Sequence, residues 1–107
     1  MNNQHNTIGS KVADRDNGQP TAKWPIFDYS GNEVGVIEAE YDNANFNRAT
    51  RECRWVVTSY HVSWFDVDNE GWFDAKAHGT TPKALAAARR YAKGTTAEVR
   101  ARWPVVS

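Results

Sequence analysis

Residues 53–67 constrain the fold of this chain more than any other segment, because β-branched and aromatic side chains dominate both alternating sets of positions. One set includes Trp55, Val57 and Phe65, and the other includes Val56, Tyr60, Val62 and Trp64. Large apolar groups on both faces are typical of a central strand that is covered on two sides or bent at a bulge. The segment therefore predicts a long central β-strand.

Turn residues on either side of this segment predict hairpins. The sequence Asp68-Asn69-Glu70-Gly71 predicts a tight turn into a returning strand over residues 72–78. On that strand Phe73 and every second residue up to Ala77 share one face, and Trp72 lies on the other.

A second hairpin is expected upstream, from a strand over residues 23–29, a turn at residues 30–32 and a strand over residues 33–41. Pro25 has no amide donor, which predicts that the first of these strands lies at an edge of the sheet. Gly35 predicts a bulge or a close backbone approach. Residues 42–52 are polar and rich in asparagine, and we expect a loop there.

Start and stop signals for one helix follow the last strand. Thr81 is a natural N-cap, Pro82 suits the first helical position, and Gly94 suits the position just after the helix. The apolar stripe on residues 83–93 consists of Ala84, Leu85, Ala88, Tyr91 and Ala92. The pattern predicts an α+β fold, with one Ala-rich helix packed on one face of an antiparallel sheet of four to five strands.

The two ends of the chain have a different character. Residues 1–22 are polar, with Ile8 and Val12 as the only aliphatic residues beyond alanine, and we expect a flexible N-terminal arm preceding a single domain over residues 23–107. Thr95 with Glu98 fits a helical capping box, but apolar residues alternate with charged ones over residues 97–103. The alternation and Pro104 favour an edge strand over residues 97–105.

Cysteine content and hydropathy indicate the compartment. Cys53 is the only cysteine, so no internal disulfide can form, and a reducing cytoplasm is expected. We expect no signal peptide, because the first residues lack a basic region followed by an apolar stretch. No apolar run approaches the roughly 18 residues of a membrane span.

No residue set in the sequence requires a catalytic or metal-binding chemistry. Residues 66–71 match the opening of a calcium-binding EF-hand loop, but position twelve is Ala77 instead of a bidentate glutamate. Ser59 and His61 share a strand face, without an evident orienting carboxylate or oxyanion hole. His61 is expected to be a half-buried sheet histidine. We therefore predict a non-enzymatic protein without metal or cofactor.

The charge of the chain is divided unevenly along its length. Residues 1–75 contain 6 Lys+Arg and 12 Asp+Glu, whereas residues 76–107 contain 7 Lys+Arg and one glutamate. Aromatic and basic side chains on one surface are typical of protein interfaces and of single-stranded nucleic-acid binding. The candidate partner-binding residues are Tyr60, Trp64, Trp72, Lys76, Arg89, Arg90, Arg100 and Arg102.

Acidic residues on the 66–74 hairpin favour a protein partner over nucleic acid, which stays the alternative. A homodimer through an edge strand, at residues 23–29 or 97–105, is a further expectation.

About a third of the chain, residues 55–92, resembles a unit of small phage and plasmid accessory proteins. It has a strand, an Asp/Asn/Gly turn, a strand entered at Gly71-Trp72-Phe73, and Gly79-Thr80-Thr81-Pro82 leading into an Ala-rich helix. Some anti-CRISPR inhibitors and HicB-like antitoxin domains are similar. The resemblance assigns no residue roles; it implies a phage-type inhibitor or adaptor that occludes a host defence protein complex.

Overall fold

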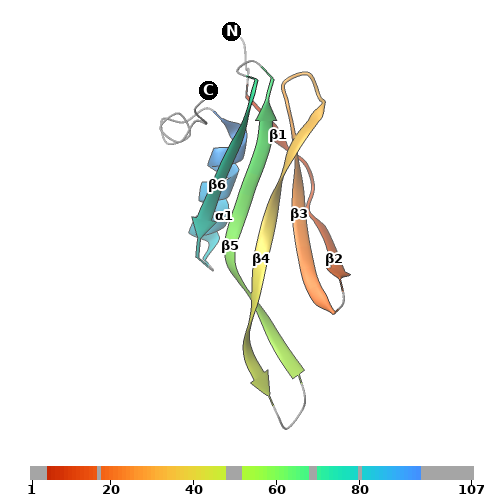
Figure 1. Ribbon diagram of the computed structural model, residues 1–107, viewed down its shortest axis with the longest axis vertical. Helices are drawn as coiled ribbons and strands as arrows, with labels where there is room; N and C mark the ends of the chain where they lie inside the picture. The colour runs from red at the N-terminus through yellow and green to blue at the C-terminus, as the bar shows by residue number, and fades with distance from the viewer. Residues whose placement is uncertain (1–4, 17, 48–51, 68–69, 80, 95–107) are drawn as a thin grey trace.

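The computed structural model describes residues 5–16, 18–47, 52–67, 70–79 and 81–94 (Figure 1). In these residues six strands precede one helix. They are β1 (Thr7–Ile8), β2 (Val12–Asp16), β3 (Gln19–Phe27), β4 (Glu33–Asn47), β5 (Glu52–Asp66), β6 (Gly71–His78) and α1 (Pro82–Lys93). All the strand pairs are antiparallel, and α1 lies on one face of the sheet, which confirms the predicted α+β fold.

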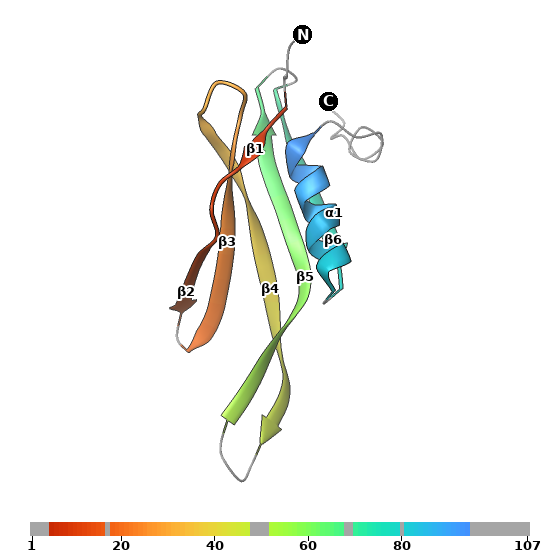
Figure 2. The same ribbon diagram turned by 180° about the vertical axis from the view of Figure 1, so that it is seen from behind.

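The sheet has the strand order β1-β3-β4-β5-β6, and β2 pairs with β3 beside β1. Figure 2 shows β1 and β2 following one another along β3. The sheet therefore has six strands instead of the four to five that were predicted, because the N-terminal residues add β1 and β2 to one edge.

The local signals for α1 act as the sequence predicts. Thr81 is the N-cap residue in extended conformation, although its side chain makes no capping hydrogen bond, and Pro82 is the first helical residue. Gly94 ends the helix with φ 74°, a left-handed conformation that favours glycine. None of the described helical residues form a helix that is long and apolar enough to cross a membrane.

The core lies between α1 and the inner face of the sheet. Phe73, Ala75 and Ala77 of β6 are buried, which confirms that this is the face the helix covers. Phe73 stacks on Trp64 of β5 with ring centroids 5.4 Å apart, and the Trp64 indole Nε1–H donates a hydrogen bond to the Tyr91 carbonyl at 3.1 Å. The indole thus joins β5 to the last turn of the helix.

Residues 5–16, which belong to the predicted flexible arm over residues 1–22, contain β1 and β2 and are bound to the rest of the fold. Asn6 is 7% exposed, and it donates from Nδ2 to the Ala92 carbonyl at 3.0 Å and from its backbone N–H to the Lys93 carbonyl at 3.1 Å. The last carbonyls of a helix lack intrahelical hydrogen-bond donors, and Asn6 supplies donors to two of them. Backbone pairing and polar capping hold residues 5–16 to the fold, and composition alone did not reveal either.

The expected edge position of β3 is also wrong, because β1 and β2 pair with it on the side away from β4. Pro25, which cannot donate to a ladder, lies opposite the interval between β1 and β2. Its carbonyl accepts from the Gly9 N–H at 2.8 Å, and a Cβ on Gly9 would lie 2.7 Å from the Pro25 ring. The proline is accommodated by interrupting the neighbouring strand.

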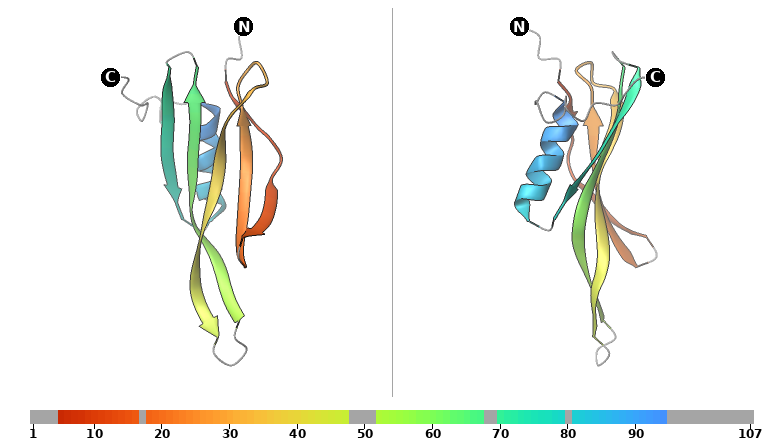
Figure 3. Two further views of the ribbon diagram at one scale, coloured as in Figure 1. Left: turned by 45° about the vertical axis from the view of Figure 1, so that its right-hand side comes forward. Right: turned by 60° about the vertical axis from the view of Figure 1, so that its left-hand side comes forward.

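The predicted loop over residues 42–52 is largely strand, because β4 continues to Asn47 and β5 begins at Glu52. β4 pairs with β3 only up to Glu38, and β5 pairs with β6 only from Ser59. The remaining parts of β4 and β5 pair with each other and extend past the other strands as a two-stranded ribbon (Figure 3). The molecule accordingly measures 58 Å along its longest axis and 27 by 25 Å across.

Candidate functional site

The helix covers only one face of the sheet, and no described element covers the other (Figure 3). We call this second surface the open face. By register and alternation its residues come from four neighbouring strands. They are Lys23 and Pro25 from β3; Val36, Glu38 and Glu40 from β4; Ser59, His61, Ser63 and Phe65 from β5; and Trp72, Asp74, Lys76 and His78 from β6.

Charged side chains alternate in sign across the centre of the open face. The Lys23 ammonium lies 3.7 Å from the Glu38 carboxylate, and the Lys76 ammonium lies 2.9 Å from the Glu40 carboxylate. His61 Nε2 lies 2.8 Å from Asp74 Oδ1. Ion pairs this exposed contribute little to stability, so their main effect is to fix a charge pattern on the surface.

Glu40 is the most connected of these groups. Its carboxylate accepts a 2.6 Å hydrogen bond from the Ser59 hydroxyl and also faces the Lys76 ammonium. These contacts, the Ser59 hydrogen bond first, hold the pKa of Glu40 below its usual value of 4.5. Glu40 is therefore charged throughout the neutral range and keeps Lys76 in place.

The serines and histidine of β5 are engaged with these carboxylates instead of with each other. The Ser59 hydroxyl donates to Glu40, and the His61 Nε2–H donates to Asp74. His61 is the half-buried, hydrogen-bonded sheet histidine that was predicted. A nucleophilic serine needs its hydroxyl directed at a base, and Ser59 directs its hydroxyl at a carboxylate that also binds a lysine.

An aromatic pair lies on the open face next to the ion pairs. Trp72 is 57% exposed, and its ring meets that of Phe65, its cross-strand neighbour, edge to face with centroids 5.5 Å apart. The half-buried Phe65 ring fixes one side of the indole and leaves the other side in solvent. Val67, just past β5, is 58% exposed. This end of the open face is apolar, and the centre is charged.

Two of the predicted partner-binding residues are in the core and cannot contact a partner on the sheet surface. Tyr60 and Trp64 are 9% and 4% exposed and point to the helix side, where burial raises the pKa of the Tyr60 hydroxyl. The prediction grouped them with Trp72, but the register pairs Trp64 with Phe73 and Phe65 with Trp72. The residue that completes the aromatic surface is therefore Phe65, not Trp64 or Tyr60.

The basic candidates are divided between two sides of the molecule. Lys76 is on the open face, whereas Arg89 and Arg90 lie on the outer side of α1, across the sheet. Arg100 and Arg102 lie outside the described residues. The described members of the predicted set therefore do not form one surface: only Trp72 and Lys76 are together.

Glu38, Glu40 and Asp74 were missing from the predicted binding set, although they set the charge of the open face. Glu38 and Glu40 are placed by the pairing of β4 with β5, in which they lie opposite His61 and Ser59, and Asp74 is placed by the pairing of β6 with β5. The only sequence signal was the alternation of Glu38 and Glu40 along β4, which is meaningful once the register is known.

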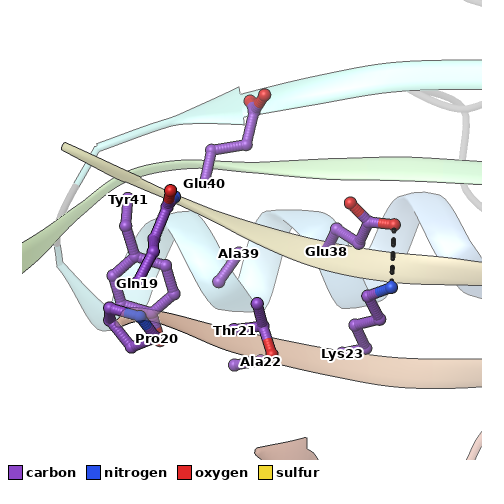
Figure 4. A pocket seen from close by; sticks show the side chains of 9 residues that line it. All are labelled: Gln19, Pro20, Thr21, Ala22, Lys23, Glu38, Ala39, Glu40 and Tyr41. Atoms are coloured by element: carbon purple, nitrogen blue, oxygen red, sulfur yellow. Dashed lines mark ion pairs between the residues drawn. The ribbon is translucent and has the colours of Figure 1, made fainter. Parts of the chain in front are cut away.

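A pocket of about 260 Å³ opens where β3 and β4 part, and both strands line it (Figure 4). Its residues are Gln19, Pro20, Thr21, Ala22 and Lys23 of β3 and Glu38, Ala39, Glu40 and Tyr41 of β4. In the part of the chain that the structure describes, no three His, Cys, Asp or Glu side chains are grouped to hold a metal ion.

Comparison of the chain with protein-family models, curated proteins and solved structures finds no match.

Proposed function

We propose that the protein is a non-catalytic binding protein that docks a partner protein on its open face. The observation that carries the proposal is the exposed Trp72 indole, held by Phe65 on a sheet face that no described element covers. Tryptophan is among the residues that contribute most to protein interfaces, and a ring fixed before binding loses little conformational entropy.

The charges beside Trp72 support a protein partner more than a nucleic acid. On the open face two lysines, Lys23 and Lys76, accompany the carboxylates of Glu38, Glu40 and Asp74. Carboxylates repel phosphates, whereas a mixed pattern can match a mixed protein surface and fix the orientation of docking. We infer an interface with an aromatic anchor at one end and paired charges at its centre.

The mode of action that we propose is occlusion, in which the open face covers a working surface of the partner. The resemblance to phage and plasmid accessory proteins suggests an inhibitor or adaptor and a host defence complex as the partner. The uncovered sheet face is suited to this role because it can cover an area without supplying any reacting group.

Affinity capture from a bacterial lysate tests the proposal. The immobilised proteins are the wild type, Trp72→Ala, and Tyr29→Ala as a control that removes an exposed aromatic ring in the turn between β3 and β4. We expect the wild type and Tyr29→Ala to retain one defined protein, and Trp72→Ala to retain at least tenfold less of it. Equal retention by Trp72→Ala, or retention of chaperones alone, contradicts the proposal.

A second candidate function, nucleic-acid binding, is favoured by the outer side of α1. The helix carries Lys83, Arg89, Arg90 and Lys93, all exposed, and no acidic residue. Binding to labelled oligonucleotides over a salt series distinguishes the two functions, because phosphate contacts weaken steeply as salt rises. Salt-dependent binding that Lys83→Glu with Arg90→Glu removes supports this candidate; no binding at low salt refutes it.

A further inference from the structure

β6 is the last strand of the described sheet, and its outer side pairs with no described strand. It runs from Gly71 to His78 without a proline and without a shift of register against β5. In the left view of Figure 3, α1 lies behind β5, so the helix covers a face of the sheet and not this edge. The opposite edge is less suited to pairing, because β1 and β2 are short and are interrupted beside Pro25. We call the outer side of residues 72–78 the β6 edge.

The pairing of β6 with β5 determines which backbone groups point to the β6 edge. Ser59 lies opposite His78, and the Gly79 N–H donates to the Thr58 carbonyl at 2.9 Å. This bond makes Ser59 and His78 a non-hydrogen-bonded pair of the antiparallel ladder, and such pairs alternate with hydrogen-bonded pairs. The backbone N–H and C=O groups of every second residue therefore point away from β5. These residues are Trp72, Asp74, Lys76 and His78.

An unpaired strand edge is a template for a further strand, and the side chains of β6 limit how a second β6 can bind there. In an antiparallel pair, the residues with outward backbone groups must lie opposite one another. A register that places Asp74 opposite Asp74, or Lys76 opposite Lys76, brings like charges together, which is unfavourable. The register centred on Ala75 instead places Asp74 opposite Lys76 on both sides of the centre.

We propose that β6 pairs in this register with β6 of a second copy, about a twofold axis at Ala75, and joins two sheets into one. The register uses the whole β6 edge, because residues 72–78 of one copy lie opposite residues 78–72 of the other. On the inner face it pairs Ala75 with Ala75 and Phe73 with Ala77. These are the non-hydrogen-bonded pairs, in which side chains come closest, and each contains an alanine.

The ion pairs within each copy are compatible with this contact. Asp74 contacts His61 and Lys76 contacts Glu40, and the side chains of Asp74 and Lys76 remain 65% and 43% exposed. In the dimer Lys76 lies between Glu40 of its own copy and Asp74 of the second copy. Exposed ion pairs contribute little to stability. The backbone hydrogen bonds therefore provide the association, and the charges select the register.

The two helices do not obstruct the contact. The twofold axis is perpendicular to the joined sheet, so both copies of α1 lie on the same face. Neighbouring strands are about 4.8 Å apart, which places the two copies of β5 about 14 Å apart across the two β6 strands. This separation exceeds the diameter of a helix with its side chains, about 10–12 Å. Two helices over β5 can therefore lie side by side.

The dimer combines two open faces in one continuous surface. Trp72 of each copy lies opposite His78 of the other, so the second copy supplies a residue beside the Phe65–Trp72 pair. Dimerisation goes beyond the proposed function and is measured on the protein alone. A failure of partner capture and a failure of dimerisation are therefore separate results.

Hydrogen exchange measured by NMR over a concentration series tests the backbone pairing. The amides of Asp74 and Lys76 point to the β6 edge, whereas those of Ala75 and Ala77 bond to β5. We expect exchange at Asp74 and Lys76 to slow about tenfold or more from low to high concentration, and Ala75 and Ala77 to be protected at every concentration. Exchange at Asp74 and Lys76 that does not depend on concentration overturns the proposal.

Sedimentation of charge variants tests the register. We expect a monomer–dimer equilibrium in which Asp74→Lys and Lys76→Asp each raise the dissociation constant about tenfold or more, because each places like charges opposite one another twice. The two substitutions together restore opposite charges, and the dissociation constant returns to within about threefold of the wild-type value. Circular dichroism confirms that each variant is folded.

The matched controls are Glu33→Lys and Arg89→Asp, which make the same two changes of net charge at exposed positions of β4 and α1. We expect both to leave the dissociation constant unchanged. A monomer at every concentration, or a dimer that neither single substitution at β6 weakens, overturns the proposal. A doubly substituted protein that dimerises no better than the single variants overturns the register.

Discussion

Replacement of Asn6 by alanine tests whether the N-terminal segment is part of the folded structure. The Asn6 side chain donates to the carbonyl of Ala92, 86 residues away in the chain, and Ala92 is fully buried at the end of α1. Asn6→Ala removes this donor. It leaves the backbone hydrogen bond from Asn6 to the Lys93 carbonyl, so the effect isolates the side chain.

The magnitude follows from the loss of a buried hydrogen bond. A buried polar group left without its partner costs about 1–3 kcal/mol, and in a small domain each kcal/mol lowers Tm by about 4–8 °C. Asn6→Asp is nearly isosteric but replaces the donor by a carboxylate near the negative end of the helix dipole. We therefore expect Asn6→Asp to destabilise the protein more than Asn6→Ala.

Urea denaturation followed by far-UV circular dichroism measures the free energy of unfolding of both variants. Ser10→Ala is the control, because it truncates an exposed polar residue of the same segment. Unfolding free energies within about 0.3 kcal/mol of the wild-type value for both variants would refute the capping role of Asn6, because the effects of independent substitutions add only to within about this amount.

Three further predictions concern the core and the open face. Phe73→Ala, at a fully buried ring between β5 and α1, lowers the unfolding free energy by about 3–5 kcal/mol in urea denaturation; a loss below 1 kcal/mol contradicts the described core. Gly35→Ala places a Cβ against the Ser63 carbonyl oxygen and the Trp64 backbone, and destabilises by about 1–3 kcal/mol or more in the same assay; wild-type stability contradicts this close approach. In a carbon-detected NMR titration we expect the pKa of Glu40 to lie below 4.5 and to rise in Ser59→Ala. The stabilisation by this carboxylate is therefore present above its unfolded pKa and is lost as pH falls through its folded pKa. An unchanged pKa in Ser59→Ala contradicts the role of the hydroxyl.

The elements of the C-terminal half could be predicted from sequence because their signals are local. The alternation of apolar residues predicted which side chains of β6 face the core. Thr81, Pro82 and Gly94 predicted where α1 begins and ends. The close approach at Gly35 was also predictable, because a glycine inside a strand often marks a place where another backbone comes near. For β6 and α1, neighbouring residues determine the structure.

The candidate site was harder to predict because it depends on register between strands. Residues 42–47 were assigned to a loop on their asparagine content, which hid the extension of β4 along β5. The contact of Glu40 with Ser59 depends on the register of β4 with β5, and that of Asp74 with His61 on the register of β5 with β6. Trp64 was placed beside Trp72 because the register of β5 with β6 was not known, and a shift of one residue moves a side chain to the other face.

The N-terminal strands were missed for a different reason. Residues 5–16 contain few apolar groups, and they are ordered by pairing with β3 and by the contact of Asn6 with the end of α1. Such contacts join segments that are far apart in the chain, and composition does not record them. Low hydrophobicity therefore excluded a core position for this segment and did not exclude a place at the sheet edge.

The dissociation constant of the captured partner, measured for wild type and Trp72→Ala, tests the central claim most directly. The claim is that the open face docks a protein through the Trp72 indole. A dominant interface residue contributes about 2 kcal/mol or more, so the substitution should raise the dissociation constant at least about 30-fold while circular dichroism remains unchanged. A dissociation constant within about twofold of the wild-type value would contradict it.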